Sequence, residues 1–254
     1  MNQFSPNTQF SFFPPAIKYL LIWNGIFFLA TINIFGAGWT PIGELFAPFL
    51  SLYPLGSGSF YPWQLVSYMF LHADLSHIFF NLFALWIFGQ ALENLWGTRR
   101  FIIYYFITGI GAAVLYQFVN MYELSVLKNE LLSMGYSPND LHEYVKAGLF
   151  NQNWPTELKL FVRKSLIPTV GASGAVFGIL LGFGMMFPDR KIMLLFPPIP
   201  IKAKYFVGIY GALELFNGLT RVDSGVAHFA HLGGLLIGFI LIKLWKLKKP
   251  SEYA

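Results

Sequence analysis

Cysteine is absent from this chain, and charged residues are scarce. Without cysteine there is no disulfide framework, no thiol nucleophile and no cysteine-based metal site. Only 11% of the residues are charged, against about 25% in a typical soluble domain, whereas 56% are hydrophobic and the mean hydropathy is +0.55. The composition therefore excludes an ordinary soluble domain and predicts a multi-pass integral membrane protein, with the lipid bilayer as its surroundings.

Long apolar runs divide the chain into six predicted membrane-spanning helices. A spanning helix needs about 20 predominantly apolar residues, and two of the six runs are shorter and rich in glycine. No internal repeat and no second domain is found, so residues 1–254 are predicted to form a single membrane domain. The predicted spans are residues 16–36, 77–95, 101–122, 172–187, 204–220 and 226–245.

The net charge of +5 is best explained by membrane topology. Lysine and arginine cluster at the ends of apolar runs, as the positive-inside rule expects, so no nucleic-acid partner is predicted. With six spans, the distribution favours two cytoplasmic termini in a plasma (inner) membrane. The basic residues assigned to the cytoplasmic side are Lys18, Arg99, Arg100, Arg190, Lys191, Lys202, Lys204, Lys243, Lys246, Lys248 and Lys249.

Two of the predicted loops have distinct compositions. The first loop, residues 37–70, has no lysine or arginine and is rich in Gly, Pro and aromatic residues, which suits a segment lying in the membrane interface. The third loop, residues 123–165, is polar and is placed on the outer side. Within it, Ser137-Pro138-Asn139-Asp140 is typical of a helix start, so the third loop is predicted to contain two short amphipathic helices.

Polar side chains occur where the second, fourth and sixth predicted helices begin, and all three helices begin on the outer side. His77 and Asn81 are four residues apart and share one face of the second helix. His231 lies about one and a half turns into the sixth helix. Intramembrane polar residues are often functional, although an interhelical hydrogen bond would explain His77 and Asn81 equally well.

Ser173 stands at the start of the fourth predicted helix, between Gly171 and Gly174. Residues 172–187 form a helix of about 24 Å at 1.5 Å per residue, shorter than a hydrocarbon core of about 30 Å. Ser173 is therefore predicted below the outer surface, reached by loop backbone that must line a wet cavity or be buried in protein. Glycines four residues apart on the fourth and sixth helices, including Gly234 and Gly238, would let these helices approach closely.

A serine beside a neutral histidine is the minimum for nucleophilic catalysis. Close packing of the fourth and sixth helices would bring His231 to Ser173, with imidazole accepting the serine proton. The oxyanion then needs preorganised donors, which His77, Asn81 and the Ser173 backbone N–H could supply. His228, one turn before His231, is interpreted as structural or interfacial.

These motifs together resemble the rhomboid family of intramembrane serine proteases. The matching patterns are H-x-x-x-x-H-x-x-x-N (His72, His77, Asn81), G-x-S-G (Gly171, Ser173, Gly174), A-H-x-x-G-x-x-x-G (Ala230, His231, Gly234, Gly238) and an E-x-x-x-G stretch (Glu93, Gly97).

The resemblance implies an all-α rhomboid bundle of six transmembrane helices and a serine endopeptidase that needs no cofactor or metal. It implies a Ser173–His231 dyad with no acidic third member, and an oxyanion hole of His77, Asn81 and the Ser173 backbone. His72 would support the first loop. The substrates would be transmembrane proteins, cleaved in or near a membrane helix at a small residue.

Two departures from the family pattern stand out. Many members place a tyrosine one turn after the serine, under the histidine ring, whereas this chain has Phe177, which can stack on His231 but cannot form a hydrogen bond. Many also carry a Trp-Arg pair in the first loop, which has no arginine here.

Three alternative functions fit the sequence less well. A catalytically inactive rhomboid-like protein that binds membrane clients would be expected to lose the serine or the histidine, and this chain keeps both. A transporter with a histidine proton relay would be expected to show repeated halves, which are not found. A metal site would use the same histidines (His72, His77, His228, His231), but no intramembrane carboxylate or cysteine is expected to join them near the outer side.

Overall fold

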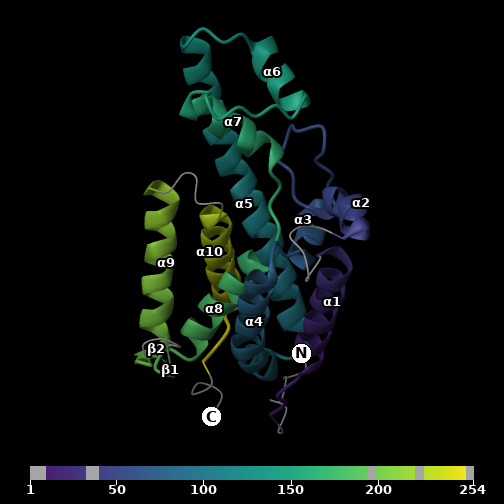
Figure 1. Cartoon of the computed structure of the whole chain (residues 1–254). Coiled ribbons are helices and arrows are strands. Elements are labelled where there is room, and N and C mark those ends of the chain that lie inside the picture. Colours follow the sequence, from purple (N-terminus) through teal and green to yellow (C-terminus); the bar gives the residue numbers. More distant parts are fainter. Residues whose placement is uncertain (1–9, 33–39, 194–197, 221–225, 250–254) are drawn as a thin grey trace.

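The computed structural model describes residues 10–32, 40–193, 198–220 and 226–249, and their secondary structure is almost entirely helical (Figure 1). A two-stranded antiparallel hairpin pairs β1 with β2. The elements are α1 (Pro15–Thr31), α2 (Pro41–Leu50), α3 (Gln64–Ser67), the 3-10 helix η1 (Tyr68–Phe70), α4 (Leu75–Trp96), α5 (Thr98–Ser133), α6 (Pro138–Lys146), α7 (Thr156–Leu166), α8 (Ser173–Met186), β1 (Lys191–Met193), β2 (Pro200–Lys202), α9 (Ala203–Thr220) and α10 (His228–Leu244).

Each of the six predicted spans contains a helix, namely α1, α4, α5, α8, α9 and α10. Residues 33–36 of the first predicted span lie outside the described residues. Of the described helices, α4 and α5 are long and apolar enough to cross a membrane by length and composition alone. Large hydrophobic side chains are exposed on much of the bundle surface, as expected where lipid replaces water. That all six helices cross the bilayer stays a prediction.

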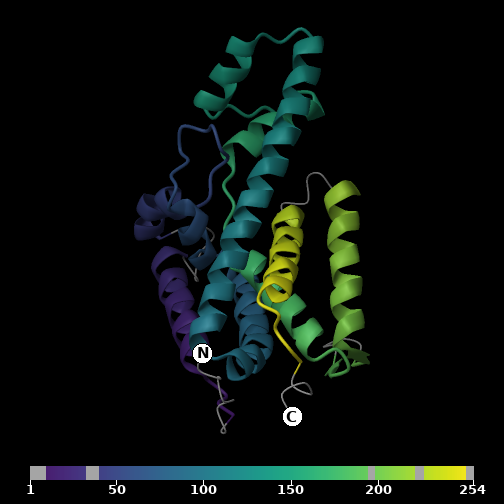
Figure 2. The same ribbon diagram turned by 180° about the vertical axis from the view of Figure 1, so that it is seen from behind.

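Helix α5 continues well beyond its predicted end at residue 122, to Ser133. The added segment, "ELSVLKNELLS", has no glycine or proline to stop a helix, and the first such residue is Gly135, with φ +96°. At 36 residues, α5 is about 54 Å long. Its end therefore projects past the other long helices and carries α6 and α7, as both views of the bundle show (Figures 1 and 2).

The two short helices predicted in the third loop are present. Ser137 caps α6 in a capping box with Asp140, which confirms the helix start read from the sequence. A small apolar cluster holds α6 and α7 against the α5 extension. Its buried members are Leu131, Leu141, Leu158 and Val162.

Helix α8 is the centre of the bundle, and α4, α5 and α10 pack around it. The predicted glycine contact with α10 is confirmed. A Cβ on Gly234 would overlap the carbonyl oxygen of Gly174, and a Cβ on Gly238 would lie 3.2 Å from the Cα of Gly178. Since the backbones of α8 and α10 touch, side chains at the beginnings of these two helices are held at contact distance.

Helix α9 stands at the edge of the bundle beside α10 (Figure 1). Most of its apolar side chains face outward, including Ile209 and Phe216, which are 55% and 61% exposed. Its three buried residues are Ala203, Val207 and Glu214. The one carboxylate of this apolar helix thus points into the protein.

The described part of the first loop, residues 40–70, reaches the segment before α8. Leu52 pairs with Thr169 through two backbone hydrogen bonds of 2.9 Å. Farther out, the rings of Phe49, Tyr61 and Trp63 form a stack. Placement of this loop in the membrane interface is a prediction that the fold leaves untested.

Candidate active site

Ser173 is the first residue of α8 and is reached through an extended segment ending at Gly171. Gly171 has φ +125° and donates its backbone N–H to the carbonyl oxygen of Tyr68 at 2.9 Å. A Cβ on Gly171 would lie 2.7 Å from His77 Nε2. Backbone conformation and space therefore both require glycine here. As a first-turn residue, Ser173 has a backbone N–H without an acceptor inside its own helix.

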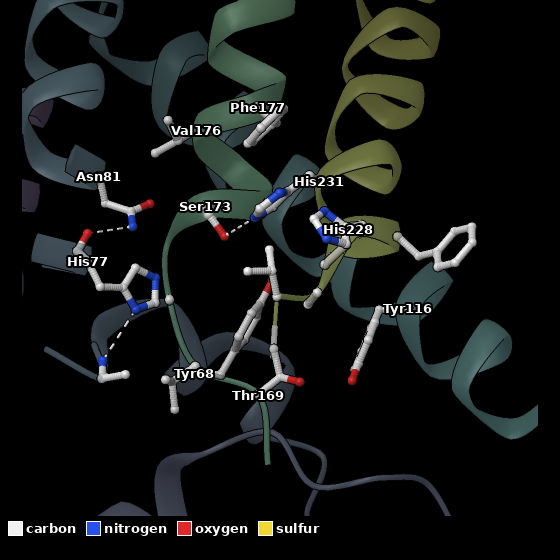
Figure 3. A pocket seen from close by; sticks show the side chains of 18 of the residues that line it. Tyr68, His77, Asn81, Tyr116, Thr169, Ser173, Val176, Phe177, His228 and His231 are labelled. Atoms are coloured by element: carbon white, nitrogen blue, oxygen red, sulfur yellow. Dashed lines mark hydrogen bonds between the residues drawn. The ribbon is translucent and has the colours of Figure 1, made fainter. Parts of the chain in front are cut away.

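His231 meets Ser173 across the α8–α10 contact. Its Nε2 lies 2.8 Å from Ser173 Oγ, which is hydrogen-bonding distance (Figure 3). Phe177, one turn after Ser173, stacks on the His231 ring with centroids 4.2 Å apart and planes 8° from parallel. The structure thus brings together the predicted serine and histidine, and the expected stacking of Phe177 is confirmed.

His77 and Asn81 lie on the α4 side of Ser173 (Figure 3). His77 Nδ1 accepts the Ala73 backbone N–H at 3.3 Å, so in a neutral ring the proton is on Nε2, the nitrogen beside Gly171. Asn81 Nδ2 donates one hydrogen to the His77 carbonyl oxygen at 2.8 Å and has a second hydrogen available. Both side chains can therefore donate toward the space next to Ser173.

His72 is fully buried just after η1. Its ring packs edge-on against that of His77, with centroids 5.0 Å apart and an interplanar angle of 70°. This contact suits a supporting residue that restricts the orientation of His77.

A cavity of about 740 Å³ opens over these residues. This is within the usual size range of ligand sites, roughly 300–1,000 Å³. Side chains of α4, α8 and α10 line one end (Figure 3), and the other end extends to Tyr116 and Glu123 on α5. Ser173, His231, His77 and Asn81 all line it.

Glu214 contradicts the expectation that no carboxylate joins the histidines. Its Oε2 lies 2.9 Å from His231 Nδ1 and 2.7 Å from His228 Nδ1. Helix α9 ends at Thr220, shortly before α10 begins, so a residue in its last two turns lies at the depth of His231. The signal was present in the sequence, because Glu214 is the only charged residue of the apolar run "YFVGIYGALELFNGLT".

Glu214, His228 and His231 also form the kind of cluster that can hold a metal ion, since their ligand atoms all lie within 4.8 Å of one another. Two ligands of a tetrahedral zinc ion with bonds of 2.0–2.1 Å stand about 3.3 Å apart. The separations of 2.7 and 2.9 Å are shorter than this and are those of hydrogen bonds. The geometry of the cluster therefore favours a hydrogen-bonded triad of side chains over a metal site.

Comparisons with known proteins give one consistent family. The rhomboid domain model matches residues 59–246. Rhomboid protease AarA from Providencia stuartii is 29% identical over 184 residues, which cover 70% of this chain and 54% of that protein. The mitochondrial Rhomboid protein 1 of Saccharomyces cerevisiae is 25% identical over 189 residues, covering 74% of this chain and 43% of that protein. This chain thus spans about half the length of these two relatives.

A third relative matches over more of its own length. Putative rhomboid protease YdcA from Bacillus subtilis is 26% identical over 201 residues, which cover 79% of this chain and 76% of that protein. The matched region of the family model contains all the candidate site residues described above.

Proposed function

Since this chain belongs to the rhomboid family of integral membrane proteins, we propose that it is a serine endopeptidase that hydrolyses peptide bonds in or near the transmembrane segments of membrane proteins. The observation that carries the proposal is the 2.8 Å contact between Ser173 Oγ and His231 Nε2 at the wall of a cavity. The pair is partly buried between α8 and α10, which separates it from a chance surface contact.

The reaction follows from this geometry. His231 Nε2 takes the Ser173 hydroxyl proton while Oγ attacks the carbonyl carbon of the scissile bond. The tetrahedral intermediate collapses when His231 gives that proton to the leaving amine, which releases one product and leaves an ester on Ser173. A water molecule then hydrolyses the ester, with His231 again acting first as base and then as acid.

The oxyanion of the intermediate needs donors on the side of Ser173 away from His231. His77 Nε2–H, the second Asn81 Nδ2 hydrogen and the Ser173 backbone N–H are the donors we assign to it. All three belong to helices, the first two turns of α4 and the first turn of α8.

Asn81→Ala is expected to lower turnover by about 10²–10³-fold, the usual cost of one oxyanion donor, and by less if the other two donors compensate. The measurement is kcat for cleavage of a transmembrane substrate in micelles. The matched control is Asn129→Ala, which removes an exposed amide from the α5 extension. Equal turnover in Asn81→Ala and wild type would mean that Asn81 is a packing residue and not an oxyanion donor.

A direct test of the activity uses purified protein and a single-span substrate reconstituted in liposomes. The expected result is two fragments whose new termini map by mass spectrometry within or beside the substrate's membrane helix. A chelator should leave the rate unchanged, because no metal takes part in the mechanism. Substrate that co-purifies with the protein but stays intact would instead support a client-binding rhomboid-like protein.

We further propose that both termini are cytoplasmic and that the site opens to the outer side. Most lysine and arginine residues gather at the helix ends away from the site, and these ends are expected on the cytoplasmic side. In a plasma membrane, a cysteine introduced at Ser133 should react with an impermeant thiol reagent in intact cells, whereas a terminal tag should be protected until the cells are opened. Labelling of the terminal tag in intact cells would overturn this orientation. Since the wild-type chain has no cysteine, a single introduced thiol reports unambiguously.

A further inference from the structure

We propose that Glu214 is a positioning residue for His231, so that the site works as a Ser173–His231–Glu214 triad. In this triad His228 holds the carboxylate in place. The inference rests on the proposed protease function and goes beyond it. The family resemblance implied a dyad, and no part of the mechanism above uses Glu214 or His228.

The hydrogen bond between His231 and Glu214 can run in one direction only. An ionised carboxylate only accepts, so His231 Nδ1 must carry the proton that faces Glu214 Oε2 at 2.9 Å. In a neutral imidazole the other nitrogen is then unprotonated. That nitrogen, Nε2, is the one 2.8 Å from Ser173 Oγ. Glu214 therefore selects the tautomer that a general base requires.

The charge of Glu214 lies inside the protein, next to His231. Glu214 is only 6% exposed on a helix whose other faces are apolar, and a charged side chain inside a membrane protein is costly unless it is paired. When His231 takes the serine proton, it becomes an imidazolium in direct contact with this carboxylate. The ion pair forms only in the transition state and intermediate, which is where added stabilisation accelerates a reaction.

The His231 ring is oriented by Phe177 as well as by Glu214. Phe177 stacks on it in parallel, which fixes the plane of the ring. Phe177 has no polar atom, so stacking cannot determine which ring nitrogen is protonated. Among the described contacts of His231, the hydrogen bond from Nδ1 to Glu214 is the one that does.

His228 gives the carboxylate a second donor. Its Nδ1 lies 2.7 Å from the same Oε2, and its ring is buried at the start of α10. Close approach of α9 and α10 at this level makes the contact possible, since a Cβ on Gly218 would lie 3.3 Å from the Cβ of His228. His228 thus keeps Glu214 in place while His231 exchanges protons with Ser173.

The variant test is Glu214→Gln, which keeps the side-chain shape and removes the charge. We expect kcat to fall by about 10²-fold or more, with KM changed much less, because Glu214 contacts His231 and is not among the residues that line the cavity. The control, Glu130→Gln, makes the same chemical change at an exposed position on α5 and should behave as wild type. In a His231→Ala background, Glu214→Gln should cause no further loss, because the carboxylate acts through His231.

A measurement on the wild-type protein covers the case in which Glu214→Gln fails to fold. Nitrogen-15 NMR of histidine-labelled protein in micelles should show the neutral His231 ring protonated at Nδ1, with its signal assigned from His231→Gln. Protonation at Nε2 would overturn the proposal. So would unchanged kcat in a folded Glu214→Gln protein.

The remaining outcomes separate this inference from its premises. An inactive Ser173→Ala protein together with a fully active Glu214→Gln protein would support the protease function and contradict the triad. Cleavage by the Ser173→Ala protein would instead contradict the proposed mechanism, in which Ser173 is the nucleophile. A metal site would be supported, and the triad contradicted, by two results together. The purified wild type would contain stoichiometric zinc that Glu214→Gln lacks, and chelation would abolish activity.

Discussion

Ser173→Ala and His231→Ala are each expected to reduce cleavage of a transmembrane substrate by on the order of 10⁴-fold or more. Ser173 supplies the atom that attacks the carbonyl carbon, and its hydroxyl is the one that lies within hydrogen-bonding distance of His231 Nε2. Without His231 the serine keeps its proton and the leaving amine receives none. Because Oγ and Nε2 act as one unit at 2.8 Å, the double variant should be no worse than either single variant.

The readout is a gel-based assay of product formation over several hours, with thermal unfolding measured for each variant. Ser173→Ala removes one hydroxyl from the start of α8, so its unfolding temperature should stay close to that of wild type. Ser133→Ala, the same change at an exposed site, is the matched control. Additive losses in the double variant would mean that the two residues act independently.

Gly234→Ala is expected to damage both stability and activity. The new methyl group would overlap the carbonyl oxygen of Gly174, which is backbone and cannot rotate away. Helices α8 and α10 must then separate, at a cost of roughly 1–3 kcal/mol or more for an overpacked site. The separation also lengthens the contact between Ser173 and His231, so turnover should fall more steeply than the folded fraction.

The measurements are the thermal unfolding temperature in micelles and kcat of the protein that remains folded. Gly208→Ala is the matched control, because a Cβ there has no heavy atom within 4 Å and the helix, α9, is of the same apolar kind. Unfolding temperatures that are equal in Gly234→Ala and Gly208→Ala would show that α8 and α10 are not held by backbone contact at Gly234.

Local chemistry explains why much of the site could be predicted. Apolar runs determine where helices form in a membrane, and the spacing of His77 and Asn81 places both on one helix face. The four-residue glycine spacing on α8 and α10 predicts a close contact, which in turn predicts that Ser173 meets His231. Each of these inferences uses residues on one helix, or on two helices whose contact is encoded by small side chains.

Glu214 was missed because its role depends on three helices at once. The number of residues between Glu214 and His231 does not determine whether the two side chains lie at the same depth in the bundle. That depth depends on where α9 ends and on how the chain turns into α10. A positive-inside count assigns little weight to acidic residues, so a lone carboxylate in an apolar run was passed over. The α5 extension was missed for a related reason: hydropathy marks where apolar residues end, whereas the helix continues to Ser133, two residues before Gly135 with its positive φ.

The central claim is that Ser173 is a nucleophile activated by His231. The most direct measurement is intact-mass analysis after reaction with a fluorophosphonate probe, followed by peptide mapping of the modified residue. The account predicts one adduct per wild-type chain, located on Ser173, a much slower reaction in His231→Ala, and none in Ser173→Ala. An adduct on another residue, or wild-type protein that cleaves its substrate at full rate after Ser173 has been modified, would contradict it.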